Sequence, residues 1–250
     1  MKKPNILHIL DYVRLFLRSL VFITVLTTYV VGKIHKSDGF FQGLEKRALF
    51  WILLWVALLA EMLIRFFPSR LHPIGSQKHM KKNYLPKPNN DQKPKRKYRG
   101  VAAVAAVWII ANAAFGILYL TGVIDAGILV LLSLAYSVCD MICVLFFCPI
   151  RTIFMHNRCC TDCRIYNWDY AMMFTPFIFL PHLYTWTLLG TSLVLLAVWE
   201  ISAICHPERF DEGCNASLGC QSCTDKPCRH KKRLCRMAKK AAKSKELLYK

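Results

Sequence analysis

Cysteine is absent from the first 138 residues, and all twelve cysteines of the chain lie between Cys139 and Cys235. Acidic residues are scarce as well: 15 Asp and Glu stand against 34 Lys and Arg, which gives a formal net charge of +19. The sequence also lacks the G-x-G-x-x-G turn, the P-loop, the G-x-S-x-G elbow and the H-E-x-x-H helix. These absences leave no soluble catalytic motif on which to base a function.

Hydrophobic residues make up 55% of the chain and gather in blocks of about 17 to 24 residues, with basic residues between the blocks. A helix that crosses a bilayer core needs about 20 apolar residues, so blocks of this length are typical of transmembrane helices. The pattern excludes collagen, a long coiled coil, a disordered tail protein and a disulfide-rich mini-domain. We predict an all-α polytopic membrane protein, a bundle of about five to six transmembrane helices.

Four blocks each have the length of one span: Leu15–Gly32, Ala48–Ile64, Val101–Gly122 and Gly127–Phe147. The last apolar region, residues 170–204, would be about 52 Å long as one straight helix, which is too long for a core of about 30 Å. Pro176 and Pro181 lie in its first half and predict a break. We therefore expect a short or broken fifth segment at 170–184 and a full span at 185–204.

The loops between the blocks predict the orientation. Residues 68–100 carry ten Lys or Arg against Asp91 alone, and residues 205–250 carry twelve against five acids. The positive-inside rule places both regions in the cytoplasm, so we expect an integral protein of a bacterial plasma membrane with both termini cytoplasmic. The predicted regions are the first two helices (1–67), a basic Pro-rich extended linker (68–100), a transmembrane hairpin (101–148), a Cys loop (149–169), the broken segment with the last helix (170–204) and a Cys-rich basic tail (205–250).

The cytoplasmic cysteines predict a metal site. Thiols in the cytoplasm stay reduced, so clustered cysteines there favour metal or redox ligands over structural disulfides. Two C-x-x-C pairs, Cys160/Cys163 and Cys220/Cys223, can supply the four thiolates of a tetrahedral site. In those four residues alone the chain is similar to the knuckle pairs of zinc ribbons and rubredoxins.

The candidate metal ligands are Cys159, Cys160, Cys163, Cys220, Cys223 and Cys228. Their spacing fits an Fe–S cluster or mononuclear iron, with zinc as the alternative. Redox-active dithiols without metal, and ordinary or acylated thiols, are the other interpretations of the same residues.

Asp140 is the candidate catalytic residue, because an ionisable group inside a span is costly and must face a partner or a polar cavity. Proton transfer is the functional interpretation, and a structural hydrogen bond to a neighbouring helix is the alternative. Its expected partners are Asn112, the Tyr136 hydroxyl or a basic residue near the interface. Arg18, in the first span, is expected to extend toward the membrane surface.

Two further pairings follow from spacing. Glu61 and Arg65 are four residues apart on one predicted helix and are expected to pair with each other. Glu200, near the end of the last span, is expected to pair with Arg164 or Arg209. The aromatic stretch at 166–186 is expected to form an interfacial belt, with a ligand or quinone pocket as the alternative.

Together these features predict membrane electron transfer or redox sensing at a cytoplasmic-face Cys-ligated metal or Fe–S site. The chain would then be a component of a membrane oxidoreductase, with a quinone as a further cofactor. Expected partners are a bilayer with anionic lipids and a soluble redox protein at the cytoplasmic face, whereas nucleic acid is not expected. The alternatives are a small transporter or channel with a structural zinc staple, and a scaffold that recruits a soluble partner.

Overall fold

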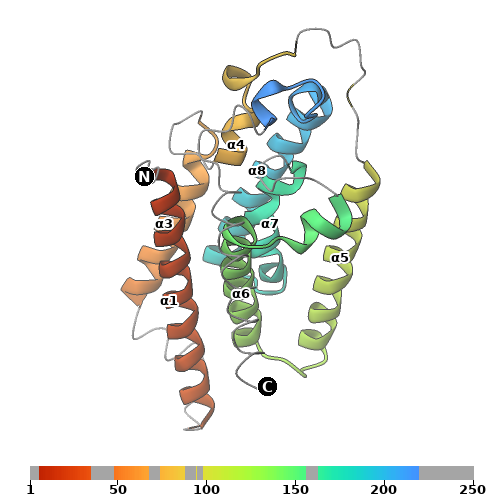
Figure 1. Cartoon of the computed structure of the whole chain (residues 1–250). Coiled ribbons are helices and arrows are strands. Elements are labelled where there is room, and N and C mark those ends of the chain that lie inside the picture. The colour runs from red at the N-terminus through yellow and green to blue at the C-terminus, as the bar shows by residue number, and fades with distance from the viewer. Residues whose placement is uncertain are drawn as a thin grey trace, which may run out of the picture.

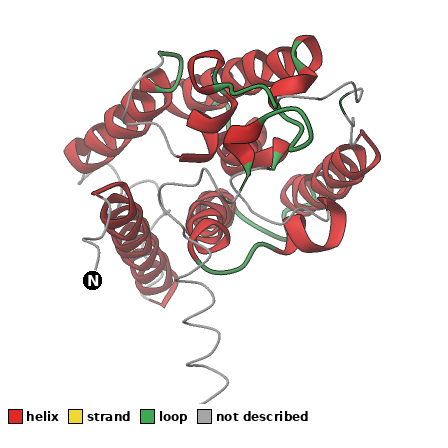
Figure 2. Cartoon of the chain, turned by 45° about the horizontal axis from the view of Figure 1, so that its top comes forward, coloured by secondary structure: helices red, strands yellow, loops and turns green. Residues whose placement is uncertain are grey.

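The computed structural model describes residues 6–34, 48–67, 74–87, 94, 98–155 and 163–219. Figure 2 shows helices and loops in this part of the chain, without a strand. Its α-helices are α1 (Ile6–Ile34), α3 (Ala48–Ile64), α4 (Ile74–His79), α5 (Tyr98–Leu120), α6 (Ala126–Leu145), α7 (Asp169–Phe174) and α8 (Leu183–Cys205). The shorter elements are η1 (Lys81–Asn83), the π-helical turn η2 (Arg151–Met155), η4 (Arg164–Trp168), η5 (Thr175–Phe179), η6 (Pro207–Arg209) and η7 (Ala216–Leu218).

Four of the described helices are long and apolar enough to cross a membrane: Ile9–Ile34, Tyr98–Leu120, Ala126–Leu145 and Leu183–Cys205. Their lipid-compatible character shows in the many large apolar side chains that remain exposed along them. The helix α3 is apolar too but shorter, and its bounds match the predicted block. The prediction of a helical membrane protein is thus supported in its coarse form.

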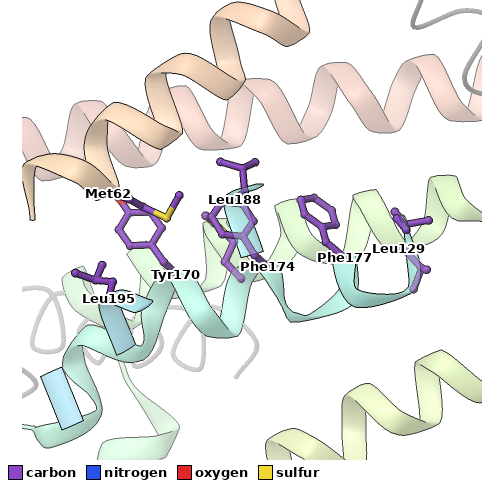
Figure 3. Packing of buried hydrophobic residues seen from close by; sticks show 9 residues of the cluster. Met62, Leu129, Tyr170, Phe174, Phe177, Leu188 and Leu195 are labelled. Carbon is purple, nitrogen blue, oxygen red and sulfur yellow. The ribbon is translucent and has the colours of Figure 1, made fainter. Parts of the chain in front are cut away.

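The helices form a bundle in which α1 packs along α6 and α3 packs against α8 (Figure 1). The short elements α7 and η5 pack against both α6 and α8, so the fifth segment lies inside the bundle. Figure 3 shows its aromatic residues in the main core, with Tyr170 beside Met62 of α3 and Phe174 beside Leu188 of α8. Burial of this aromatic face holds a segment that is too short to be stable alone.

The fifth segment breaks where the prolines predict. The turn after η5 closes with the amide of Leu180 donating to the Phe177 carbonyl, and α8 begins after His182. Gly116 of α5 lies against Phe179 so closely that a Cβ at this position would overlap the ring. Glycine therefore permits the close approach of η5 to α5, as small residues do at helix contacts in lipid.

Residues 74–87 differ from the expected extended linker. They form α4 and η1 and pack against residues 206–219 of the tail, which together we call the cap. His79 stacks on Phe210 with ring centroids 4.6 Å apart and meets the edge of Trp199 on α8 at 5.4 Å. The linker prediction was wrong here because polar residues stabilise the cap, so it has no apolar periodicity that a sequence would reveal.

Asn215 is the central polar residue of the cap and has no exposed surface. Its amide nitrogen donates to the carbonyls of Lys78 and Arg209, and its oxygen accepts from the Ser217 amide. The amide of Ala216 donates to the Leu85 carbonyl across the same interface. These bonds tie the linker to the tail at the end of the bundle where α1 begins, which we call the N-terminal end.

Candidate functional site

Cys163 is the one predicted metal ligand within the described residues. The other five lie outside them: Cys159, Cys160, Cys220, Cys223 and Cys228. The Cys163 side chain is 6% exposed and packs in a small cluster with Val101 and Val104 of α5 and with Met155 of η2. Cys163, which directly precedes η4, is therefore held against the first turns of α5.

A cavity of about 150 Å³ lies beside Cys163, between α5, α6 and α7. Its wall also contains Cys139 and Cys143, one turn apart on α6, and Cys148 just after that helix. Two thioethers complete the sulfur atoms of the wall, those of Met172 and Met173. No disulfide joins these cysteines. We call this feature the sulfur-lined cavity; it unites Cys163 with the Asp140 region, which the sequence presented as a separate group.

Among the residues that the structure describes, no three His, Cys, Asp or Glu side chains are grouped closely enough to hold a metal ion. The four cavity thiols are therefore near one another without forming a preassembled coordination sphere. A Cys-ligated centre that includes Cys163 needs further ligands from the cysteines outside the described ranges.

Asp140 lines the sulfur-lined cavity and forms an ion pair with Arg18 of α1 at 3.4 Å. The same guanidinium group donates to the Ser137 carbonyl at 3.3 Å. The expectation of a basic partner for Asp140 is confirmed. Arg18 pairs with this carboxylate inside the bundle, where an unpaired carboxylate would be costly; its extension toward the membrane surface stays a prediction.

Asp169 is the second carboxylate of the cavity wall and accepts from Arg65 at 2.7 Å. The two side chains are 8% and 9% exposed, and the Arg65 guanidinium also lies 4.3 Å from the centre of the Tyr170 ring. Glu61 instead pairs with Arg14 at 3.4 Å and with Arg18 at 3.6 Å.

The predicted pairing of Glu61 with Arg65 along one helix was therefore wrong. Both side chains find partners on other elements, where burial strengthens each interaction more than exposure on a helix surface would. The result is a network of charges that joins α1, α3, α6 and α7.

Glu200 of α8 pairs with Arg164 of η4, which confirms one of its two expected partners. Trp168 donates its indole N–H to Glu200 at 2.8 Å, and Trp199 donates to the Arg164 carbonyl at 2.8 Å. Trp168 is thus a hydrogen-bond donor within the protein, and the interfacial belt stays a prediction. Tyr184, in contrast, is 53% exposed near the start of α8.

Sequence reasoning missed two features of this region. Asn112, expected near Asp140, donates instead to the Trp108 carbonyl of its own helix at 2.9 Å. The pairing of Arg65 with Asp169 was also not predicted. The two residues are 104 positions apart, and nothing in the sequence near either residue indicates its partner. The i,i+4 spacing of Cys139 and Cys143 was the one signal in the sequence for the sulfur-lined cavity.

The cavity brings polarisable sulfur atoms and two ion-paired carboxylates together. Thiols bind soft metals and exchange electrons, and carboxylates can accept or pass protons. Comparisons with models of known families, with curated proteins and with solved structures found no match to this chain.

Proposed function

We propose that the chain is an integral membrane protein that holds a Cys-ligated metal or Fe–S centre at the cytoplasmic face and acts in membrane electron transfer or redox sensing. The observation that carries this proposal is the sulfur-lined cavity, in which Cys163 lies with three further cysteines and two ion-paired carboxylates. The proposed ligands are Cys159, Cys160, Cys163, Cys220, Cys223 and Cys228. Iron or an Fe–S cluster is the proposed centre, with zinc as the alternative.

The contacts of α4 support a shared centre for loop and tail cysteines. Ser76 of α4 donates to Asn167 of η4 at 2.5 Å, and Ser217 of η7 donates to the Lys78 carbonyl at 3.1 Å. Cys163 directly precedes η4, and η7 ends two residues before Cys220. One six-residue helix thus contacts both elements from which the two cysteine segments extend.

The path of the fifth segment supports six passes. Arg164, in the element η4 that leads into the segment, pairs with Glu200 near the last turn of α8, whereas Phe179 at the end of η5 packs on Gly116 near the last turn of α5. The segment thus runs from the N-terminal end of the bundle toward the opposite end, and α8 returns the chain to the N-terminal end. The cap then joins linker and tail on one side, and their shared positive charge favours the cytoplasm for that side.

Asp140 is proposed to transfer protons that accompany the electrons. It is positioned between the cavity and the arginine network, with Arg18 as its ion-pair partner. A carboxylate in this position can accept a proton from a ligand in the cavity, and the arginine stabilises its charged form once the proton has left.

The proposal is tested by elemental analysis of protein purified anaerobically. We expect Cys163→Ser to lower the metal content to less than half of the wild-type value, and Cys160→Ser and Cys220→Ser to do the same. Cys205→Ser is the matched control, because Cys205 is exposed at the end of α8 and is not a proposed ligand. An unchanged metal content in the first three variants would refute the proposed centre.

A transporter or channel with a zinc staple is the second candidate, and the charge network on four elements favours it. In that case zinc would join the loop to the tail and Asp140 would lie on the transport path. Substrate or ion flux in liposomes that Asp140→Asn abolishes, together with a redox-inactive zinc site, would select this function over electron transfer.

A further inference from the structure

The sulfur-lined cavity has the size of one six-membered ring. Its volume is about 150 Å³, and an apolar protein cavity of about that volume is known to bind benzene. The space is far larger than a metal ion needs and only partly enclosed, so substituents on a ring can extend beyond it. The occupant that fits is a single ring whose substituents extend out of the cavity.

Two aromatic side chains form one wall of the cavity. Trp108 of α5 and Tyr136 of α6 lie with ring centroids 4.7 Å apart at an interplanar angle of 57°. The indole N–H of Trp108 donates to Thr175 at 3.2 Å, which fixes the ring in place. A planar ligand can stack on such a fixed aromatic surface, and polarisable cysteine sulfur atoms on α6 face the same space.

Polar groups form a smaller part of the cavity wall, which also contains Val144, Ile150 and Ile165. These polar groups are Asp140 and Asp169, each of which is paired with an arginine, and the phenol of Tyr166. Hydroxyl and thiol groups can donate to a ring carbonyl, while carboxylates can accept from a ring hydroxyl. This combination suits a ring that carries oxygen atoms at opposite edges better than it suits a plain hydrocarbon.

We propose that the sulfur-lined cavity binds the ring of a membrane-soluble benzoquinone. The inference deepens the proposed function and rests on it, because it names the small-molecule electron carrier that a centre at this end of the bundle would exchange electrons with. The binding itself needs only the described residues, so it can be measured apart from any metal.

The test is a titration of the detergent-purified protein with duroquinone, a fully substituted benzoquinone that leaves no ring position open to addition by the thiols. We expect saturable quenching of the fluorescence of Trp108, which lies in the cavity wall. Trp108→Phe removes this reporter and should abolish the saturable component. Val144→Phe fills the cavity and should weaken binding at least tenfold, whereas Val198→Phe, at a 52% exposed site on α8, should leave it unchanged.

Durene, the same tetramethylated ring without its two oxygen atoms, is the competitor that tests the ligand class. We expect it to displace duroquinone only at concentrations at least tenfold higher. Equal competition by durene, or unchanged binding in Val144→Phe, would overturn the proposal. If Val144→Phe fails to fold, Ile150→Phe fills the same cavity from outside α6 and takes its place.

The two proposals can fail separately. Saturable duroquinone binding in a protein without Cys163-dependent metal would leave the quinone site in place and refute the metal centre. Metal loss in Cys163→Ser without saturable quinone binding to the wild-type protein would support the metal centre and refute the quinone site.

Discussion

Gly116→Ala tests the packing that brings the fifth segment through the bundle. A Cβ at residue 116 would overlap the ring of Phe179, so η5 or α5 must shift. Overpacking of this kind costs about 1–3 kcal/mol, and the better helix propensity of Ala offsets at most about 1 kcal/mol. With the full offset we expect a net loss of about 0–2 kcal/mol relative to the wild type, a fall in Tm of up to roughly 8 °C for a chain of this length, and a loss of about 1–3 kcal/mol relative to a glycine-to-alanine change without overlap.

Gly190→Ala is the matched control, because a Cβ at residue 190 of α8 meets no atom within 4 Å. We expect an unchanged or slightly higher Tm for it, measured by tryptophan fluorescence during heating in one detergent. Phe179→Leu should relieve the overlap, so that Gly116→Ala costs less in the Phe179→Leu background than in the wild type. If Gly116→Ala is as stable as Gly190→Ala, η5 does not lie against α5 and the reasoning is refuted.

The remaining predictions concern polar contacts. Asp169→Asn leaves the buried Arg65 guanidinium without its counter-charge, and we expect the free energy of unfolding to fall by about 3–5 kcal/mol. The Tm should fall accordingly, and the double change Arg65→Met/Asp169→Leu should largely restore it. An unchanged Tm in the single variant would contradict the pairing. Asn215→Ala removes the central hydrogen bonds of the cap. We expect limited proteolysis within residues 68–100 to be at least several times faster in this variant than in the wild type. An unchanged rate of cleavage would show that the cap does not protect the linker. Partial burial raises the pKa of the Asp125 carboxyl, but hydrogen bonds from Lys33 and the Ile128 amide outweigh it and hold that pKa below its ordinary value. The ionised Asp125 carboxylate therefore stabilises the fold slightly at a pH above the ordinary carboxyl pKa, and this stabilisation is lost as the pH falls through the lowered pKa of Asp125. Asp125→Asn should make the Tm fall less steeply at acidic pH. An unchanged pH dependence of the Tm at acidic pH would contradict the prediction.

The sequence predicted the long helices well because block length and hydrophobicity decide where a helix can cross a bilayer. The helix α3 has the predicted bounds, and α8 begins two residues before its predicted span. The break in the fifth segment also followed from a local cause, since Pro176 and Pro181 cannot continue one straight helix.

The tertiary contacts could not be predicted in the same way. Arg18 meets Asp140 across 122 residues of sequence, and nothing near either residue specifies that partner. The cap depends on the buried amide of Asn215 and the ring of His79, which form no periodic pattern. The candidate site was predicted in part: Asp140 was identified as an ionisable group inside a span, but only packing of η4 on α5 brings Cys163 to the same cavity.

The most direct measurement of the central claim is the metal content and the visible absorption spectrum of the anaerobically purified wild-type protein, alongside Cys163→Ser. Our account predicts bound metal in the wild type, with thiolate-to-iron charge-transfer bands if the centre is iron, and loss of both in the variant. Wild-type protein without stoichiometric metal, or with a spectrum and metal content that Cys163→Ser leaves unchanged, would contradict the account.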